Sequence, residues 1–304
     1  MKGLASYVMR GLSQAVMVTS VLALLSLFLP LLGIISAAVV GLVTLRQGAR
    51  NGLRVALLST LAAGIILALS IANPLPVLGF LVLQWFPLWL LGGLLRSTRS
   101  LNLSLQAALG FGVLAILVQY LLLGDPAQAW LTQLQPLMEQ LSKSGVVDAS
   151  QGTEFTRELA GWMAGVLAAG IFLQLILSLL LARWWQAQLY NPGGFRSEFR
   201  QLRVSKWLGV VGLPALAVLL LSSLEAPELL RHFGTLLLAP FFLLGLAVVH
   251  ATLGSTGAGT AWLIAVYLLL FVVMPQAVLM LALIGLLDVW IDFRRRFERY
   301  RSAG

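Results

Sequence analysis

The chain contains no cysteine, only two histidines, and only 10% charged residues among its 304 positions. The absence of cysteine excludes disulfides, thiolate catalysis and cysteine-ligated metal sites. Soluble domains carry roughly a quarter of charged residues, so this scarcity of charge excludes a water-soluble fold. Because 60% of the residues are hydrophobic and long apolar runs recur along the whole length, the sequence indicates an all-α, polytopic integral membrane protein with a single transmembrane domain, 1–304.

Prolines interrupt the first and last apolar runs. Pro30 separates Leu12–Leu29 from Leu31–Leu45, which together are too long for one span of about 20 residues, so a short hairpin is expected there. The last block, Trp262–Leu287, has Pro275 at its centre and forms either one span or a second short hairpin. With the second hairpin the count is about ten passes, with eight or nine as alternatives. Six further runs are expected to span the membrane: Leu53–Ala72, Val77–Leu95, Leu103–Leu123, Leu159–Leu181, Trp207–Leu224 and Gly234–Leu253.

The distribution of cations predicts the sides of the membrane. The basic loop 183–206 is assigned to the cytoplasm, where short loops collect Lys and Arg. Alternation from this loop places the basic tail 288–304 outside if the last block is one span, and inside if Pro275 splits it. The hairpin is therefore favoured, with both termini in the cytoplasm.

The segment 124–158 is the longest polar stretch and is expected to be an external amphipathic insertion. Asp125 followed by Pro126 predicts a helix start, since an acceptor side chain precedes a proline at the first helical position. Pro136 is expected to kink this helix, which lies on the membrane or packs on the mouths of the spans. One apolar stripe follows the helical spacing: Trp130, Leu134, Leu137 and Leu141.

A ladder of small residues opens the run Leu159–Leu181. Gly161, Gly165 and Ala169 recur at every fourth position. This spacing predicts close approach by the backbone of another helix.

Catalytic and metal-binding groups are scarce. No pair of acids lies deep in an apolar run, so neither a proton relay nor a carboxylate metal site is indicated. His232 is expected to be solvated in an external loop. His250 and Ser255 superficially resemble a Ser/His hydrolase pair, but a flexible connector after a helix whose histidine bonds a neighbouring carbonyl is favoured. We expect no enzyme activity, no metal and no cofactor. Nucleic acid is not an expected partner either, because the cations lie in short loops between spans.

Glutamines inside the apolar runs are the candidate ligand-binding groups. Gln84, with two tryptophans nearby and Asn73 at the mouth of the span, is expected to line a cavity. The alternative is that the glutamines make ordinary hydrogen bonds between helices and that the tryptophans anchor the interface. The candidate ligand-binding residues are Asn73, Gln84, Trp85, Trp89, Gln119 and Gln174.

Two basic stretches suit the cytoplasmic interface. Phe195, Phe199 and Leu202 recur at helical spacing, and an arginine follows each, which predicts a short amphipathic helix against anionic lipid headgroups. In the tail, Asp288 and Asp292 precede Arg295 and Arg296 at helical pair spacing, so salt bridges are the simplest role, and a docking surface for a partner is the alternative. The candidate lipid or partner contacts are Arg196, Arg200, Arg203, Arg294 and Arg295.

These basic stretches also carry a family resemblance. Arg183–Ala187 (RWWQA), Asn191–Phe199 (NPGGFRSEF) and Asp288–Arg294 (DVWIDFR) resemble the proteobacterial branch of the YybS-like family of bacterial inner-membrane proteins. The span pattern is similar over most of the chain, and the resemblance implies a location in the bacterial inner (cytoplasmic) membrane. That family is distantly similar to the substrate-binding subunits of energy-coupling-factor vitamin transporters, which implies small-molecule transport and supplies no binding residue here.

Two functions are expected from these features. The first is a transporter-like or small-molecule-binding membrane subunit without its own ATPase, since no ATP-binding motif occurs. Its partners would be the lipid bilayer and a small-molecule ligand in a polar or aromatic cavity near mid-membrane. The alternative is a non-catalytic membrane scaffold that acts through a protein partner docked on the basic cytoplasmic face.

Overall fold

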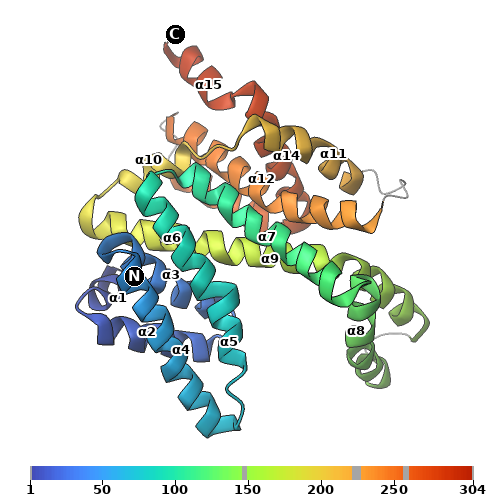
Figure 1. Ribbon diagram of the computed structural model, residues 1–304. Helices are drawn as coiled ribbons and strands as arrows, with labels where there is room; N and C mark the ends of the chain where they lie inside the picture. Colours follow the sequence, from blue (N-terminus) through green and yellow to red (C-terminus); the bar gives the residue numbers. More distant parts are fainter. Residues whose placement is uncertain (1, 146–148, 221–226, 256–259, 303–304) are drawn as a thin grey trace. The chain divides into compact units, whose positions relative to one another are not determined.

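The computed structural model describes residues 2–145, 149–220, 227–255 and 260–302, and all regular secondary structure in these ranges is helical (Figure 1). The chain clusters into two compact units. Unit 1 consists of Met1–Ala108 and Leu173–Leu202, and unit 2 consists of Leu109–Phe172 and Arg203–Gly304. Two long helices, α7 (Leu101–Leu123) and α9 (Ala149–Tyr190), contribute residues to both units.

Unit 1 is built around a helix that is apolar on all sides. In α3, every residue from Ser36 to Leu45 is buried, because the helix carries no charge there and packs against α2, α4 and α6. A break precedes α3 at Pro30, as the sequence predicted. The helices of unit 1 are α1 (Lys2–Val8), α2 (Leu12–Leu25), α3 (Leu31–Gln47), α4 (Ala49–Ile71), α5 (Pro76–Phe80), η1 (Leu81–Trp85), α6 (Phe86–Thr98), α10 (Gly194–Arg200) and parts of α7 (Leu101–Leu123) and α9 (Ala149–Tyr190).

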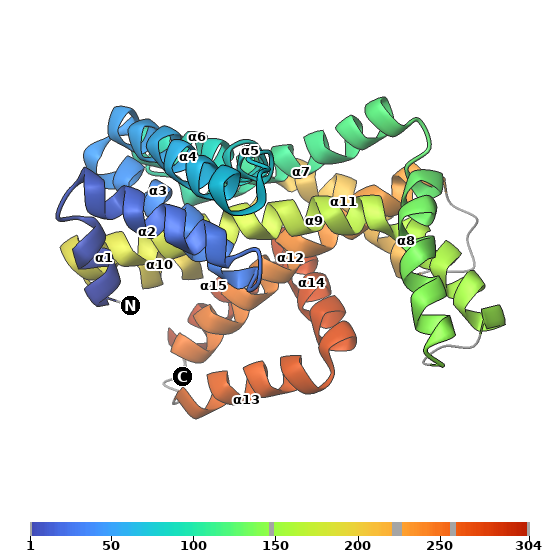
Figure 2. The same ribbon diagram turned by 90° about the horizontal axis from the view of Figure 1, so that it is seen from below.

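Unit 2 is organised around the contact of α12 with α14, where two glycines let the backbones touch. A Cβ atom on Gly245 would lie 1.9 Å from the Leu281 carbonyl oxygen, and one on Gly285 would lie 2.0 Å from the Phe241 carbonyl oxygen. In the sequence, α13 lies between these two helices. In space it extends away from the pair (Figure 2), and most of its apolar side chains are exposed. Besides parts of α7 and α9, the helices of unit 2 are α8 (Pro126–Lys143), α11 (Lys206–Leu220), α12 (Glu228–Ser255), α13 (Thr260–Val272), α14 (Met274–Ile291) and α15 (Phe293–Ser302).

The apolar helices agree with the predicted passes. Within the described ranges, six are long and apolar enough to cross a membrane: α4, the continuous helix Pro76–Thr98, α7, α9, α12 and α14. Four shorter apolar helices, α2, α3, α11 and α13, coincide with the other apolar runs of the sequence. The last block is interrupted at Val273, and Pro275 lies in the first turn of α14, so the break predicted there is confirmed.

Two helix boundaries differ from the prediction. α9 extends from Ala149 to Tyr190, well beyond the expected Leu159–Leu181, so much of the predicted basic loop 183–206 is helical. α12 begins at Glu228 and includes residues that the sequence placed in a loop. The apolar pattern marks only the membrane-buried part of a helix, whereas Glu, Gln, Arg and Ala continue it into polar surroundings because they are good helix formers.

The helix predicted within 124–158 is confirmed as α8. The Asp125 carboxylate accepts a hydrogen bond of 3.0 Å from the Gln128 N–H and caps the helix. The helix continues through Pro136. Asp148 lies outside the described residues, and the acids near the end of the predicted insertion belong to the first turns of α9.

The small-residue ladder on α9 allows the close approach of another helix at Gly165, as its spacing predicts. A Cβ atom on Gly165 would lie 2.9 Å from the Cα atom of His232 on α12 and 3.0 Å from its carbonyl oxygen. The missing side chain therefore lets the backbones of α9 and α12 approach within unit 2.

Candidate functional site

A turn of π-helix interrupts one candidate span in unit 1. The helix from Pro76 to Thr98 is continuous, but its turn Leu81–Trp85, labelled η1, has the wider π-helical pattern. Such turns insert an extra residue into the helix and recur at functional sites. Gln84 and Trp85 are the last two residues of this turn, and both side chains lie beside α3.

Gln84 forms a polar pair with Gln174 of α9. The Gln174 Nε2 group donates a hydrogen bond of 3.2 Å to Gln84 Oε1, and both side chains are half-buried. Gly33 of α3 leaves space for the pair, since a Cβ atom there would lie 3.2 Å from Gln84 Oε1 and 3.4 Å from Gln174 Nε2. The two amides thus meet beside the backbone of α3, the buried central helix.

Trp85 is fully buried next to this pair. Its indole N–H donates a hydrogen bond of 3.2 Å to the Ser36 hydroxyl, which in turn donates to the Thr19 carbonyl oxygen at 2.8 Å. We call Gly33, Ser36, Gln84, Trp85 and Gln174 the glutamine cluster. Gln84, Trp85 and Gln174 were candidates from the sequence, whereas Gly33 and Ser36 were not, because a glycine and a serine in an apolar helix are commonplace.

The other two candidates in unit 1 have local roles. The Trp89 indole donates a hydrogen bond of 2.7 Å to the Ala49 carbonyl oxygen, which joins α6 to the start of α4. Asn73 is exposed, and its side-chain oxygen accepts a hydrogen bond from the Leu75 N–H in the turn before α5. Neither residue contacts the glutamine cluster through a described hydrogen bond.

Gln119 belongs to unit 2 and joins three helices there. Its Nε2 group donates to the Ala164 carbonyl oxygen of α9 at 3.2 Å, and its Oε1 atom accepts from the Trp130 indole of α8 at 3.1 Å. The ordinary inter-helix role that the sequence left open therefore describes this residue. Through this contact α8 is held against the ends of α7 and α9.

His232 is fully buried, and the prediction that it is solvated in a loop is wrong. Because α12 begins at Glu228, His232 lies in its second turn and faces α9. The Gly161 carbonyl oxygen lies 2.9 Å from its Nε2 atom and can only accept, so Nε2 carries the proton. Nδ1 then accepts from the Tyr120 hydroxyl at 3.0 Å. The imidazole is a structural connection among α7, α9 and α12.

His250 bonds a carbonyl of its own helix, as the favoured interpretation predicted. Its Nδ1 atom lies 2.8 Å from the Leu246 carbonyl oxygen, and its Nε2 atom lies 3.3 Å from the Tyr267 hydroxyl of α13. The side chain of Ser255 and the residues Thr256 and Gly257 lie outside the described residues. In the described part of the chain, no three His, Asp or Glu side chains are grouped as metal ligands.

The basic candidates of α10 belong to unit 1. The amphipathic helix predicted around Phe195 and Phe199 is confirmed as α10, and these two rings stack at a centroid distance of 6.1 Å. Arg196 is exposed. Burial, followed by the neighbouring charge of Arg196, lowers the pKa of Arg200 below its ordinary value.

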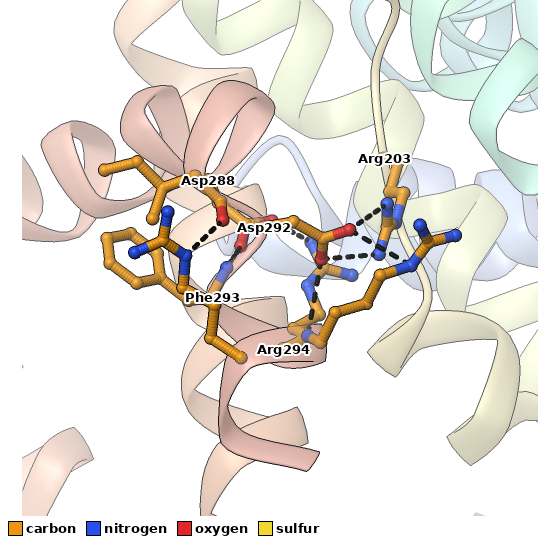
Figure 3. A network of polar contacts seen from close by, with 8 residues as sticks. Arg203, Asp288, Asp292, Phe293 and Arg294 are labelled. Carbon is orange, nitrogen blue, oxygen red and sulfur yellow. Dashed lines mark hydrogen bonds and ion pairs between the residues drawn. The ribbon is translucent and has the colours of Figure 1, made fainter. Parts of the chain in front are cut away.

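The remaining basic candidates form a network at the start of α15 in unit 2 (Figure 3). Arg203 makes a bidentate contact with Asp292, at 3.0 and 2.8 Å, and Arg295 lies 3.2 Å from the same carboxylate. Burial alone would raise the pKa of Asp292, but the hydrogen bonds and charge of Arg203, together with Arg295, hold this pKa below its ordinary value. We call Arg203, Asp288, Asp292, Arg294 and Arg295 the tail network.

Arg294 differs from its predicted role at a lipid or partner surface. It is only 7% exposed and donates a hydrogen bond of 2.8 Å to Asp288, whose other oxygen accepts from the Phe293 N–H at 2.9 Å. Burial lowers the pKa of Arg294, and the negative charge of Asp288 opposes this effect. Of the salt bridges expected in the tail, the pair of Asp292 with Arg295 is present as predicted, whereas Asp288 pairs with Arg294.

The fold and these sites define a polytopic helical membrane protein whose polar groups lie between apolar helices. The chain matches the family described as "Predicted membrane protein (DUF2232)" over residues 17–289, and it belongs to this family. No curated protein and no solved structure is significantly similar to the chain.

Proposed function

We propose that this protein is a small-molecule-binding, transporter-like subunit of the bacterial inner membrane. The observation that supports this function is the glutamine cluster in unit 1. Two amide side chains carry four N–H donors and two acceptor oxygens, and the Gln84–Gln174 hydrogen bond uses one of each. The remaining capacity is available to a polar ligand between apolar helices.

The surroundings of the cluster strengthen such recognition. Hydrogen bonds in apolar surroundings are stronger than in water, and ligand sites combine mostly apolar walls with a few convergent polar groups. Trp85 and Leu88 provide buried apolar surface on the same helix. Because the chain has no ATP-binding motif, energised transport would depend on an ion gradient or another subunit, and we propose no catalytic role.

The test is ligand binding by the purified protein in lipid nanodiscs. A library of small polar metabolites is screened by native mass spectrometry and thermal stabilisation, and the variants Gln84→Leu and Gln174→Leu should each lose the bound compound. Gln106→Leu is the matched control, because Gln106 is also half-buried in unit 1 but bonds only to the Asn102 carbonyl oxygen of its own helix. Binding that is equal in all three variants would refute the assignment of the site.

A scaffold function remains the second proposal, and the exposure of Arg196 on α10 favours it. In this function a protein partner docks on the basic cytoplasmic face. Arg196→Glu should abolish co-purification of such a partner, whereas Arg54→Glu, which reverses an exposed charge on α4, should not. Arg203 is unsuitable for this test because its reversal would also break the contact with Asp292.

A further inference from the structure

A hollow of about 500 Å³ opens in unit 1 where α3, α6 and α9 end. Three helices that are distant in sequence bring four arginines to its wall. Arg46 belongs to the last turn of α3, Arg96 and Arg99 lie at the end of α6, and Arg183 lies near the end of α9. We call this hollow, with Tyr190 and Glu198 in its lining, the arginine pocket.

Contacts within unit 1 hold three of these guanidinium groups in position. Arg96 Nη1 donates a hydrogen bond of 2.8 Å to the Leu45 carbonyl oxygen, and the Arg46 guanidinium stacks on the Tyr190 ring at 4.1 Å from its centroid. Arg183 forms a two-pronged contact with the carboxylate of Glu198, with Nε to Oε2 at 2.8 Å. The positive groups are therefore positioned before any ligand arrives.

The charge in the pocket is unbalanced. Four arginines face one glutamate, which leaves a net charge of +3, and the single carboxylate is already engaged by Arg183. Like charges that converge on one hollow repel one another, and a bound anion relieves this repulsion. If the only role of these arginines were to fix the cytoplasmic side, their mutual repulsion would be smaller with each guanidinium group extended separately into water.

We propose that the arginine pocket binds a phosphate-bearing group. The planar guanidinium fork matches the oxygens of phosphate, and stacked or backbone-bonded arginines keep further N–H donors for it. The volume lies within the range of small-molecule sites, so it holds a phosphate together with a small organic moiety. Two sources share this chemistry: the headgroup of an anionic phospholipid and a soluble phosphorylated molecule. The inference goes beyond the proposed function, because none of these arginines belongs to the glutamine cluster.

The experiment compares two variants that each remove two positive charges from unit 1. Arg46→Gln with Arg96→Gln alters the pocket, whereas Arg50→Gln with Arg54→Gln alters exposed cations at the start of α4 that do not line it. Inorganic phosphate is titrated into each protein in phosphatidylcholine nanodiscs. In parallel, native mass spectrometry measures the phosphatidylglycerol retained from mixed nanodiscs. We expect the pocket variant to bind about tenfold more weakly than the wild type, since charge-assisted hydrogen bonds are lost, and the control to be unchanged.

Each outcome has a defined meaning. Pocket-dependent binding of phosphate identifies a soluble ligand, and pocket-dependent retention of phosphatidylglycerol alone identifies a lipid headgroup. If neither probe distinguishes the pocket variant from the control, the proposal is wrong. Should the double variant fail to fold, Arg99→Gln replaces it, because Arg99 is exposed and lines the pocket from the end of α6. A loss of less than about twofold with Arg99→Gln would then overturn the proposal.

Discussion

At the scale of single residues, Gly33 controls the space available to the glutamine cluster. A methyl group in its place would meet Gln84 Oε1 at 3.2 Å and Gln174 Nε2 at 3.4 Å, so the amide pair would have to move by a few tenths of an ångström. Alanine also favours the helix over glycine by roughly 0.5–1 kcal/mol. We therefore expect Gly33→Ala not to raise the free energy of unfolding, because the strain at the amide pair cancels the helix preference of alanine. Gly93→Ala, with nothing within 4 Å of its new Cβ atom, should raise the free energy of unfolding by that preference. Thermal unfolding of the two variants in one detergent checks this, and equal shifts would contradict it.

The buried ion pair of the tail network is a second case at this scale. Asp288 and Arg294 are 6% and 7% exposed, so removing Asp288 takes a hydrogen-bonded counter-charge away from a buried guanidinium group. We expect Asp288→Ala to lower the free energy of unfolding by about 3 kcal/mol, and a second substitution, Arg294→Met, to restore part of the loss. Unfolding in a titration with sodium dodecyl sulfate measures both.

Asp292→Ala serves as the control for this pair. Its carboxylate is 23% exposed and its partner Arg203 is 43% exposed, so solvent screens their contact and the expected cost is under about 1 kcal/mol. If Asp288→Ala lowers the free energy of unfolding by no more than Asp292→Ala does, burial of the Asp288–Arg294 pair does not increase its contribution to stability.

At the scale of helices, the crossing of α12 and α14 depends on the absence of two side chains. Any Cβ atom on Gly245 or Gly285 would lie about 2 Å from a carbonyl oxygen of the other helix, which side-chain rotation cannot relieve because the obstacle is backbone. We expect Gly245→Ala to destabilise unit 2 by about 3 kcal/mol or more, since the helices must separate. Gly110→Ala is the control, because a Cβ atom on this α7 residue meets nothing within 4 Å. Proteolysis of the membrane-embedded protein measures both effects, and similar resistance in the two variants would exclude this packing.

Much of this helical arrangement was predictable, because hydropathy and proline report directly on burial in a bilayer. The breaks at Pro30 and before Pro275, the capped start of α8 and the close approach at Gly165 all follow from local chemistry. The burial of His232 was not predictable in the same way. It depends on the polar first turn of α12 being helical and on its contact with α9, and hydropathy reports neither.

In the candidate site, too, the residues were predictable but the contacts between distant segments were not. Gln84 and Gln174 were both candidates as isolated amides, but their contact brings together residues 90 positions apart, and one sequence contains no signal for that pairing. The arginines of the arginine pocket lie in or next to short segments between apolar runs, a position that indicates the cytoplasmic side but not that the side chains converge. Their convergence depends on where α3, α6 and α9 end.

At the scale of the whole molecule, the sides of the membrane decide where each proposed site operates. Placing α10 and the tail in the cytoplasm requires α13 and α14 to be separate passes, because one continuous pass would move α15 to the outside. The helix break at Val273 separates α13 from α14. A short pass such as α13 is tolerated when the bilayer thins locally or neighbouring helices cover its ends.

The natural absence of cysteine makes this arrangement directly measurable, because each introduced cysteine is the sole reporter. We expect Ser144→Cys, after α8, to react in intact cells with a maleimide that cannot cross the inner membrane. Ser197→Cys on α10 and Phe297→Cys on α15 should react only after that membrane is permeabilised, and all three native side chains are exposed. Labelling of Phe297→Cys from the outside, with Ser197→Cys still protected, would show that α13 does not cross the bilayer. The tail network would then face the exterior, while the α10 surface and the arginine pocket, which contains Glu198 of that helix, would keep their cytoplasmic assignment.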